Sequence, residues 1–177
     1  MWKGRQYMRS YTKPANPKTT GQTANRLHMS ALVLYWQQEI ALTPSAVTAW
    51  NAAGLSDLIS GFNRFIKGMR GYVLSAVTLD HATFSMTVES VGIPANEAQV
   101  VVITAGGVLK QGFKFGPGVY TSANFVSWTP AMNDEVYVVD RKALGSTTLD
   151  PTAAVLYGAP LYWANESTGA ITQVKLT

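Results

Sequence analysis

A mainly β fold is predicted for this chain by three features of its sequence. Seven or eight short apolar runs follow residue 71 at roughly ten-residue spacing, and Gly, Pro and Asn turns separate them. Apolar residues make up 47% of the chain, enough to bury a core, while charged residues make up only 14%. A basic segment and two or three helical stretches precede the runs. Together these features predict an Ig-like or fibronectin-like β-sandwich, preceded by an extended N-terminal arm and a short helical segment.

Residues 1–22 are predicted to form an extended basic arm. Pro14 and Pro17 prevent a helix there, and residues before a proline avoid the α region. The first 38 residues hold six Lys or Arg and no Asp or Glu, whereas residues 39–177 hold eight against ten. Charge gathered in a terminal segment indicates a partner surface more than a substrate pocket.

Basic and aromatic side chains alternate loosely along this arm. We expect them to contact a protein partner, with Arg pairing carboxylates through two hydrogen bonds. The expected contact residues are Trp2, Lys3, Arg5, Tyr7, Arg9, Lys13, Lys18 and Arg26. Two other interpretations stay open, a solvated tail and a nucleic-acid contact through phosphates and stacked bases. Nucleic acid is not the expected partner, because six charges are few for it and the remaining sequence has no matching basic cluster.

Residues 23–70 are predicted to hold two or three short helices. The second helix would begin after the hydrophobic staple residue Leu42 and end at Gly54. The start signals are Thr23, then Thr43 followed by Pro44, and finally Ser56 or Ser60. The first helix would carry an apolar stripe of Leu27, Ala31, Leu34, Tyr35 and Ala41.

Residues 71–177 are predicted to form the β-sandwich domain. The continuous apolar run at 100–103 is typical of a central strand. A hairpin is expected through Asp80, His81 and Ala82. The expected strands cover 72–79, 83–88, 98–105, 108–115, 119–128, 135–141, 153–163 and 170–176.

Patterns typical of catalysis or metal binding are missing from the sequence. There is no cysteine, so thiolate chemistry and disulfides are excluded. His28 and His81 do not begin a metal-ligand spacing, and the adjacent strand residues Asp134 and Glu135 would point to opposite faces. The glycine-rich segments lack the Gly-Lys-Ser/Thr ending of a phosphate loop. We therefore expect a protein that is not an enzyme and that binds no cofactor and no metal.

Aromatic residues allow a second interpretation of the β region. They would either form a sugar-binding platform or pack in the core and on the sheet faces, and packing is the favoured interpretation. The residues concerned are Trp128, Tyr137, Tyr157, Tyr162 and Trp163. Trp36 and Trp50 lie on helical stripes, where contacts between helices or with the sheet explain them.

A longer pattern at the N-terminus resembles a known family. It runs from Trp2-Lys3-Gly4-Arg5 through Arg9-Ser10 and Asn16-Pro17 to Thr19, Gln22 and Arg26. It is similar to the N-terminal signature of uncharacterised proteins from Bacteroidota genomes and phages. In that family a helical segment with a Phe-based ending follows, as residues 62–67 do here, and then a variable β domain. The resemblance implies no activity.

The order of arm, helical hairpin and sandwich is also similar to small proteins encoded among phage head and tail genes. This resemblance implies a virion structural protein: a capsid-associated or decoration protein, a head–tail connector at the neck, or a tail component. Its partners would be capsid, portal or tail subunits, with a homo-oligomer in the assembled particle. The alternative is an Ig-like module that binds a glycan or a host-surface protein.

The location expected for such a protein is the virion, after assembly in the cytoplasm of the host bacterium. The N-terminus lacks the apolar core of a signal peptide. No apolar run approaches the ~18 residues that a membrane helix needs, so no membrane is expected as a partner.

Overall fold

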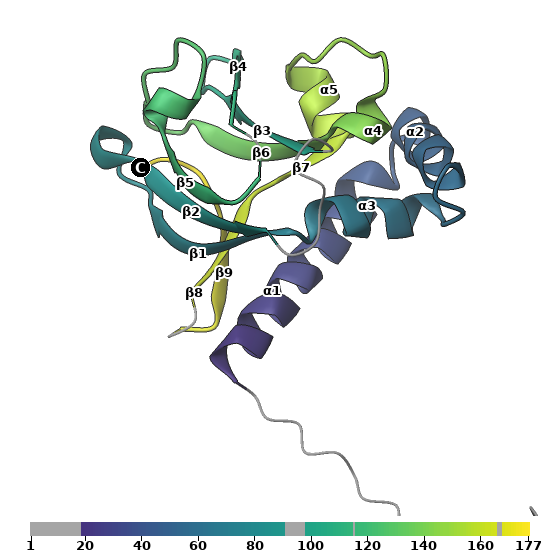
Figure 1. The fold of residues 1–177 in the computed structure, drawn as a ribbon, viewed down its shortest axis with the longest axis horizontal. Coiled ribbons are helices and arrows are strands. Elements are labelled where there is room, and N and C mark those ends of the chain that lie inside the picture. The colour runs from purple at the N-terminus through teal and green to yellow at the C-terminus, as the bar shows by residue number, and fades with distance from the viewer. Residues whose placement is uncertain (1–18, 91–97, 115, 166–167) are drawn as a thin grey trace, which may run out of the picture.

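The computed structural model of this 177-residue chain describes residues 19–90, 98–114, 116–165 and 168–177. Within them, nine strands form three antiparallel sheets, and helices gather beside the sheets (Figure 1). This arrangement is compatible with the predicted β-sandwich. The helical content is larger than the sequence predicted, because two helices interrupt the β region. Most of the predicted arm lies outside the described residues.

Helix α1 (Thr20–Tyr35) begins four residues earlier than predicted. Thr19, and not Thr23, is the N-cap: its backbone is extended and its hydroxyl accepts a hydrogen bond from the amide of Gln22. The Thr23 hydroxyl instead donates to the Thr19 carbonyl from inside the first turn. The last residues of the predicted arm therefore belong to the helix. A five-residue π-helix, η1 (Trp36–Ile40), continues α1.

Helices α2 (Pro44–Leu55) and α3 (Gly61–Met69) confirm the other start signals. Proline occupies the first turn of α2, and the Ser60 hydroxyl accepts from an amide of α3. The predicted staple is wrong, since Leu42 is 74% exposed. Trp50 is fully buried and its ring meets that of Phe65 edge-on at 5.3 Å, as expected for a contact between helices.

The first sheet has the strand order β1-β2-β5. Strands β1 (Tyr72–Thr78) and β2 (Ser85–Ser90) form the predicted hairpin, closed by the short 3-10 turn His81–Thr83. Strand β5 (Gly118–Thr121) is shorter than predicted. The chain leaves it in a second 3-10 turn, where the side chains and amides of Thr121 and Asn124 cap each other.

The second sheet has the order β4-β3-β6-β7 and contains the predicted central strand. β3 (Ala98–Ile103) pairs with both β4 (Leu109–Gln111) and β6 (Glu135–Asp140), and β6 also pairs with β7 (Gly158–Pro160). A third, two-stranded sheet joins β8 (Tyr162–Asn165) to β9 (Ala170–Gln173).

Alternate residues of the central strands β3 and β6 pack into two different cores, one on each face of the sheet. Val100 and Val102 face the main core, which includes residues of β1, β2 and the helices. Val101 and Val139 face a smaller core on the other side, closed by α4 (Arg141–Leu144) and α5 (Pro151–Leu156). Burial on both faces explains why 100–103 is apolar without alternation.

The strand predicted over 153–163 is wrong in its first half. Asp150 accepts a hydrogen bond from the Ala153 amide, and Pro151 occupies the first turn, so this stretch begins as helix α5. The strand predicted over 135–141 ends one residue earlier because Asp140 caps α4. Both helices start at an Asp N-cap, Asp140 or Asp150, but the apolar pattern around it predicted only strands.

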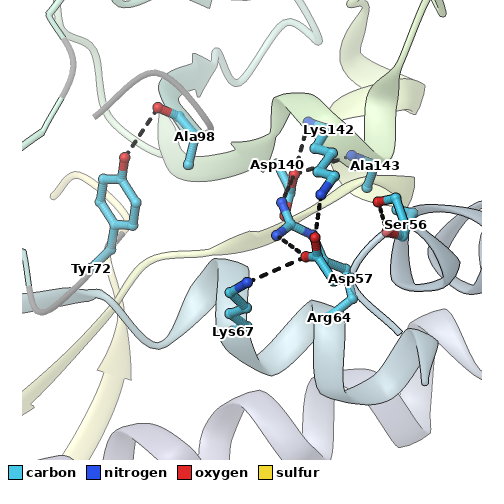
Figure 2. A network of polar contacts seen from close by, with 10 residues as sticks. Ser56, Asp57, Arg64, Lys67, Tyr72, Ala98, Asp140, Lys142 and Ala143 are labelled. Carbon is cyan, nitrogen blue, oxygen red and sulfur yellow. Dashed lines mark hydrogen bonds and ion pairs between the residues drawn. The ribbon is translucent and has the colours of Figure 1, made fainter. Parts of the chain in front are cut away.

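A buried ion pair joins α3 to the end of β6 (Figure 2). Arg64 and Asp140 have side chains only 1% exposed, and Nη2 of the arginine lies 2.7 Å from Oδ2 of the aspartate. Oδ1 of Asp140 also accepts from the amides of Lys142 and Ala143, at 2.8 and 3.1 Å. The carboxylate thus caps α4 while it binds α3. Burial raises the pKa of Asp140, and the guanidinium opposes that change.

Asp57, in the turn between α2 and α3, extends this network towards the surface (Figure 2). It accepts from Arg64 at 3.1 Å and from Lys67 at 3.3 Å, and Lys142 reaches its other oxygen. The hydrogen bond from Lys142 lowers the pKa of Asp57 to about 2. Gly68 lets the elements approach closely, because a Cβ there would lie 2.4 Å from Oδ2 of Asp140.

Removing one partner of the buried pair should be strongly destabilising. We expect Asp140→Ala to lower the free energy of unfolding by about 3–5 kcal/mol, because it removes the buried carboxylate that faces the Arg64 charge and the cap of α4. Urea denaturation followed by tryptophan fluorescence measures the loss. The matched control is Lys67→Ala, whose half-exposed side chain belongs to the same network and should change stability by less than about 1 kcal/mol. Equal effects of the two substitutions would contradict the assignment.

Asp57 should make stability depend on pH in acid. Its pKa in the folded state is below the ordinary value, so its contribution is present above about pH 4 and is lost as the pH falls towards about 2. We expect the urea midpoint of the native chain to fall more steeply over this window than that of Asp57→Asn. Parallel pH profiles of the two proteins would contradict this prediction.

Candidate functional site

A groove of about 500 Å³ lies between the C-terminal half of α1 and strands β6 to β9. Its volume is within the range of about 300–1,000 Å³ that ligand pockets show. One wall comes from α1 and η1, and the other from strands β6 to β9 and Val155 of α5. The lining residues are Leu27, Ser30, Ala31, Leu34, Tyr35, Gln38, Glu39, Tyr137, Val155, Pro160, Tyr162, Ile171 and Gln173.

The floor of the groove is apolar and aromatic. Tyr35 is buried in the last turn of α1, and its hydroxyl donates to the Val155 carbonyl at 3.1 Å, which ties α1 to α5. Tyr137 is also buried, on β6, where it pairs with Pro160 of β7. The Tyr137 hydroxyl donates to Oε2 of Glu135 at 3.3 Å. These contacts hold both rings in fixed positions.

The rim of the groove is polar. Gln173 lines it and donates from Nε2 to the carboxylate of Glu135 at 3.1 Å, and Nζ of Lys175 donates to the same carboxylate at 3.0 Å. Glu39 stands exposed on η1 at the opposite side. In the part of the chain that the structure describes, its carboxylate has no ion-pair partner. π-Helical turns such as η1 are rare, and many of those known occur at functional sites.

The tyrosines of the groove remain neutral at physiological pH. Burial raises the pKa of Tyr162 to about 12, and the Glu39 carboxylate adds to the effect. Burial also raises the pKa of Tyr35 and of Tyr137 above the ordinary value. Among the described lining residues, Glu39 therefore carries the one charge. Such a groove suits an apolar or aromatic segment that carries a cation at the level of the rim.

The predicted contact residues lie largely beyond the part of the chain that the structure describes. Of the eight, Trp2, Lys3, Arg5, Tyr7, Arg9, Lys13 and Lys18 fall outside it, and their role stays a prediction. Arg26 lies on an exposed part of α1 and its carbonyl accepts from the Ser30 hydroxyl at 2.9 Å. Because Leu27 and Ser30 line the groove, Arg26 lies directly before the residue at which the α1 wall begins.

The aromatic residues do not gather into a sugar-binding platform, which was the less favoured of the two interpretations. Trp128 is 6% exposed, packs against Phe84 and Phe125, and donates from Nε1 to Asp134 at 2.8 Å. Packing is thus the confirmed interpretation for Trp128. Two members of the set, Tyr137 and Tyr162, do meet at the groove.

The helical wall of the groove was not recognised as a site from the sequence. Leu27, Ala31, Leu34 and Tyr35 belong to the stripe that predicted the first helix. An apolar stripe alone does not distinguish a core contact from the wall of a groove. The exposure of Leu34, 52%, makes that distinction in the structure.

A second hollow, of about 400 Å³, lies near the start of α1. His28 lines it with Asn25, Met29, Arg70 and Val73, and burial lowers the pKa of His28 so that the ring is neutral at pH 7. Across the described ranges, no three His, Cys, Asp or Glu side chains group in a way that would hold a metal ion. None of the helices in these ranges is long and apolar enough to cross a membrane.

Comparisons with protein-family models, with curated proteins and with solved structures found no match for this chain. The resemblance of its N-terminal signature to the Bacteroidota and phage family therefore stays a prediction. The groove and the buried network rest on the geometry alone.

The hydroxyl of Tyr35 should stabilise the floor of the groove. We expect Tyr35→Phe to lower the free energy of unfolding by about 1 kcal/mol, because the Val155 carbonyl loses its donor. Thermal or urea denaturation measures the change. Tyr157→Phe is the matched control, since no hydrogen bond of that hydroxyl is seen among the described residues, and it should stay within about 0.5 kcal/mol. An unchanged free energy of unfolding in Tyr35→Phe would show that this hydrogen bond does not hold α1 to α5.

Proposed function

We propose that this chain is a non-enzymatic structural subunit of a bacteriophage particle, placed on the capsid or at the head–tail junction. Its basic N-terminal segment would anchor it to neighbouring subunits. The observation that carries the proposal is the division of charge: six cations stand within the first 26 residues, and residues 39–177 sum to a slight negative charge. A charged segment that precedes a folded body is a typical device for attachment.

The body has the rigidity that such a role requires. The Arg64–Asp140 pair fixes α3 against β6, and the Tyr35 hydroxyl fixes the end of α1 against α5. The basic segment leads directly into α1, so a force on the segment is transmitted to the core. Repeated copies on a symmetric particle add avidity to each individual contact.

A ligand-binding module with an Ig-like sandwich is the second candidate. The observation that favours it is the pair Tyr137 and Tyr162 in the groove, because aromatic rings are suited to stack on sugars and to pack against peptide side chains. A glycan array with the purified chain tests it. Binding that is lost in Tyr162→Ala would replace the structural proposal, and the absence of binding would remove this candidate.

The structural proposal predicts that the chain is present in purified particles of the phage that encodes it. Mass spectrometry of particles purified by density gradient measures its copy number. We expect deletion of residues 2–18 to abolish incorporation while the melting temperature of the purified protein is unchanged, since α1 and its Thr19 cap are intact. Absence of the native chain from the particles, or normal copy number of the deletion variant, would contradict the proposal.

The deletion boundary provides a matched control. Removing residues 2–22 also removes the Thr19 cap and the first residues of α1, which should cost about 1 kcal/mol of stability. If the deletion of residues 2–18 already abolishes incorporation while its stability is native, the loss is due to attachment and not to folding.

A further inference from the structure

We propose that the groove between α1 and β6 to β9 receives residues 2–13 of a neighbouring copy of this chain. The inference rests on the proposed function, which brings copies side by side, and it names the partner of the basic segment. Each copy would then hold its neighbour by one arm and one groove.

The chemistry of the segment matches that of the groove. The groove offers an apolar and aromatic floor below one carboxylate, Glu39, that has no ion-pair partner among the described residues. Residues 2–13 bring Tyr7 and Tyr11, which lie close enough in the sequence to share the floor, and basic side chains for the rim. They contain no Asp or Glu that Glu39 would repel. A neutral or acidic segment would match only half of this surface.

The dimensions also agree. Along α1 and η1 the lining residues run from Leu27 to Glu39, which at 1.5 Å per residue is about 18 Å. An extended segment of twelve residues spans up to about 40 Å, so half of it covers the groove. The other half remains to bridge the distance between two copies.

The sequence before α1 favours a neighbouring copy over the same copy. Pro14 and Pro17 favour an extended backbone, and Thr19 is itself extended, with φ −67° and ψ 152°. For residues 2–13 to enter the groove of their own copy, the chain would have to reverse within this stretch and run back along α1. Entry into the groove of a neighbour requires no reversal.

The absence of cysteine from the native chain allows a direct test with the full-length protein. One batch carries Tyr7→Cys and a second, with a different affinity tag, carries Leu34→Cys, whose side chain is 52% exposed on the groove wall. The two are mixed and oxidised, and the mixed disulfide is followed on non-reducing gels. The matched control replaces Leu34→Cys with Gln111→Cys, exposed on the edge strand β4.

We expect the Tyr7→Cys and Leu34→Cys pair to cross-link more than about tenfold faster than the control pair, because docking raises the local thiol concentration. Glu39→Lys in the groove copy should abolish that advantage, and Glu39→Gln should reduce it. Equal rates for the two pairs would overturn the inference. So would a double variant, Tyr7→Cys with Leu34→Cys, that forms only an intramolecular disulfide.

The result is independent of the test of the proposed function. If the chain is present in purified particles but shows no preferred cross-link, the inference fails and the structural role stands. If the cross-link forms but the chain is absent from particles, arm exchange stands and the phage role fails.

Discussion

The contact on which this structure depends is the buried ion pair between Arg64 and Asp140. It links the helical segment to the second sheet at a point where neither side chain reaches water. Asp140 also caps α4, and Arg64 also binds the turn that holds Asp57. A buried charge is tolerated only with its partners in place, so α3, α4 and β6 must be formed together. The end of α1 packs on α3 through Tyr35 and Phe65, and the same helix forms one wall of the groove.

The sequence predicted the helices and strands better than it predicted the contacts between them. Threonine and serine caps with proline located α2 and α3, and the apolar run at 100–103 located the central strand. Asp150 and Pro151 are the N-cap and first residue of α5, a typical start of a helix. The sequence nevertheless predicted a strand there, because the apolar residues that follow suit a strand equally well. The partners of the buried pair lie 76 residues apart, and no local pattern connects them.

The candidate site shows the same limit. The sequence indicates that Tyr137 and Tyr162 are aromatic residues of the β region and that the stripe through Ala31 is helical, but nothing local indicates that they line one groove. The basic segment, in contrast, is evident from charge alone. The proposed partner surface is thus evident in the sequence, whereas the groove proposed to receive it is formed only by the fold.

The most direct measurement is the solution mass of the full-length chain by light scattering over a range of concentrations. The account predicts a defined assembly heavier than the 19.1 kDa single chain, and Arg5→Glu with Arg9→Glu should return it to that mass. High salt should weaken the assembly, because the contact is partly electrostatic. A protein that stays at 19.1 kDa at every concentration, with or without these substitutions, would contradict the claim that the arm joins copies of the chain.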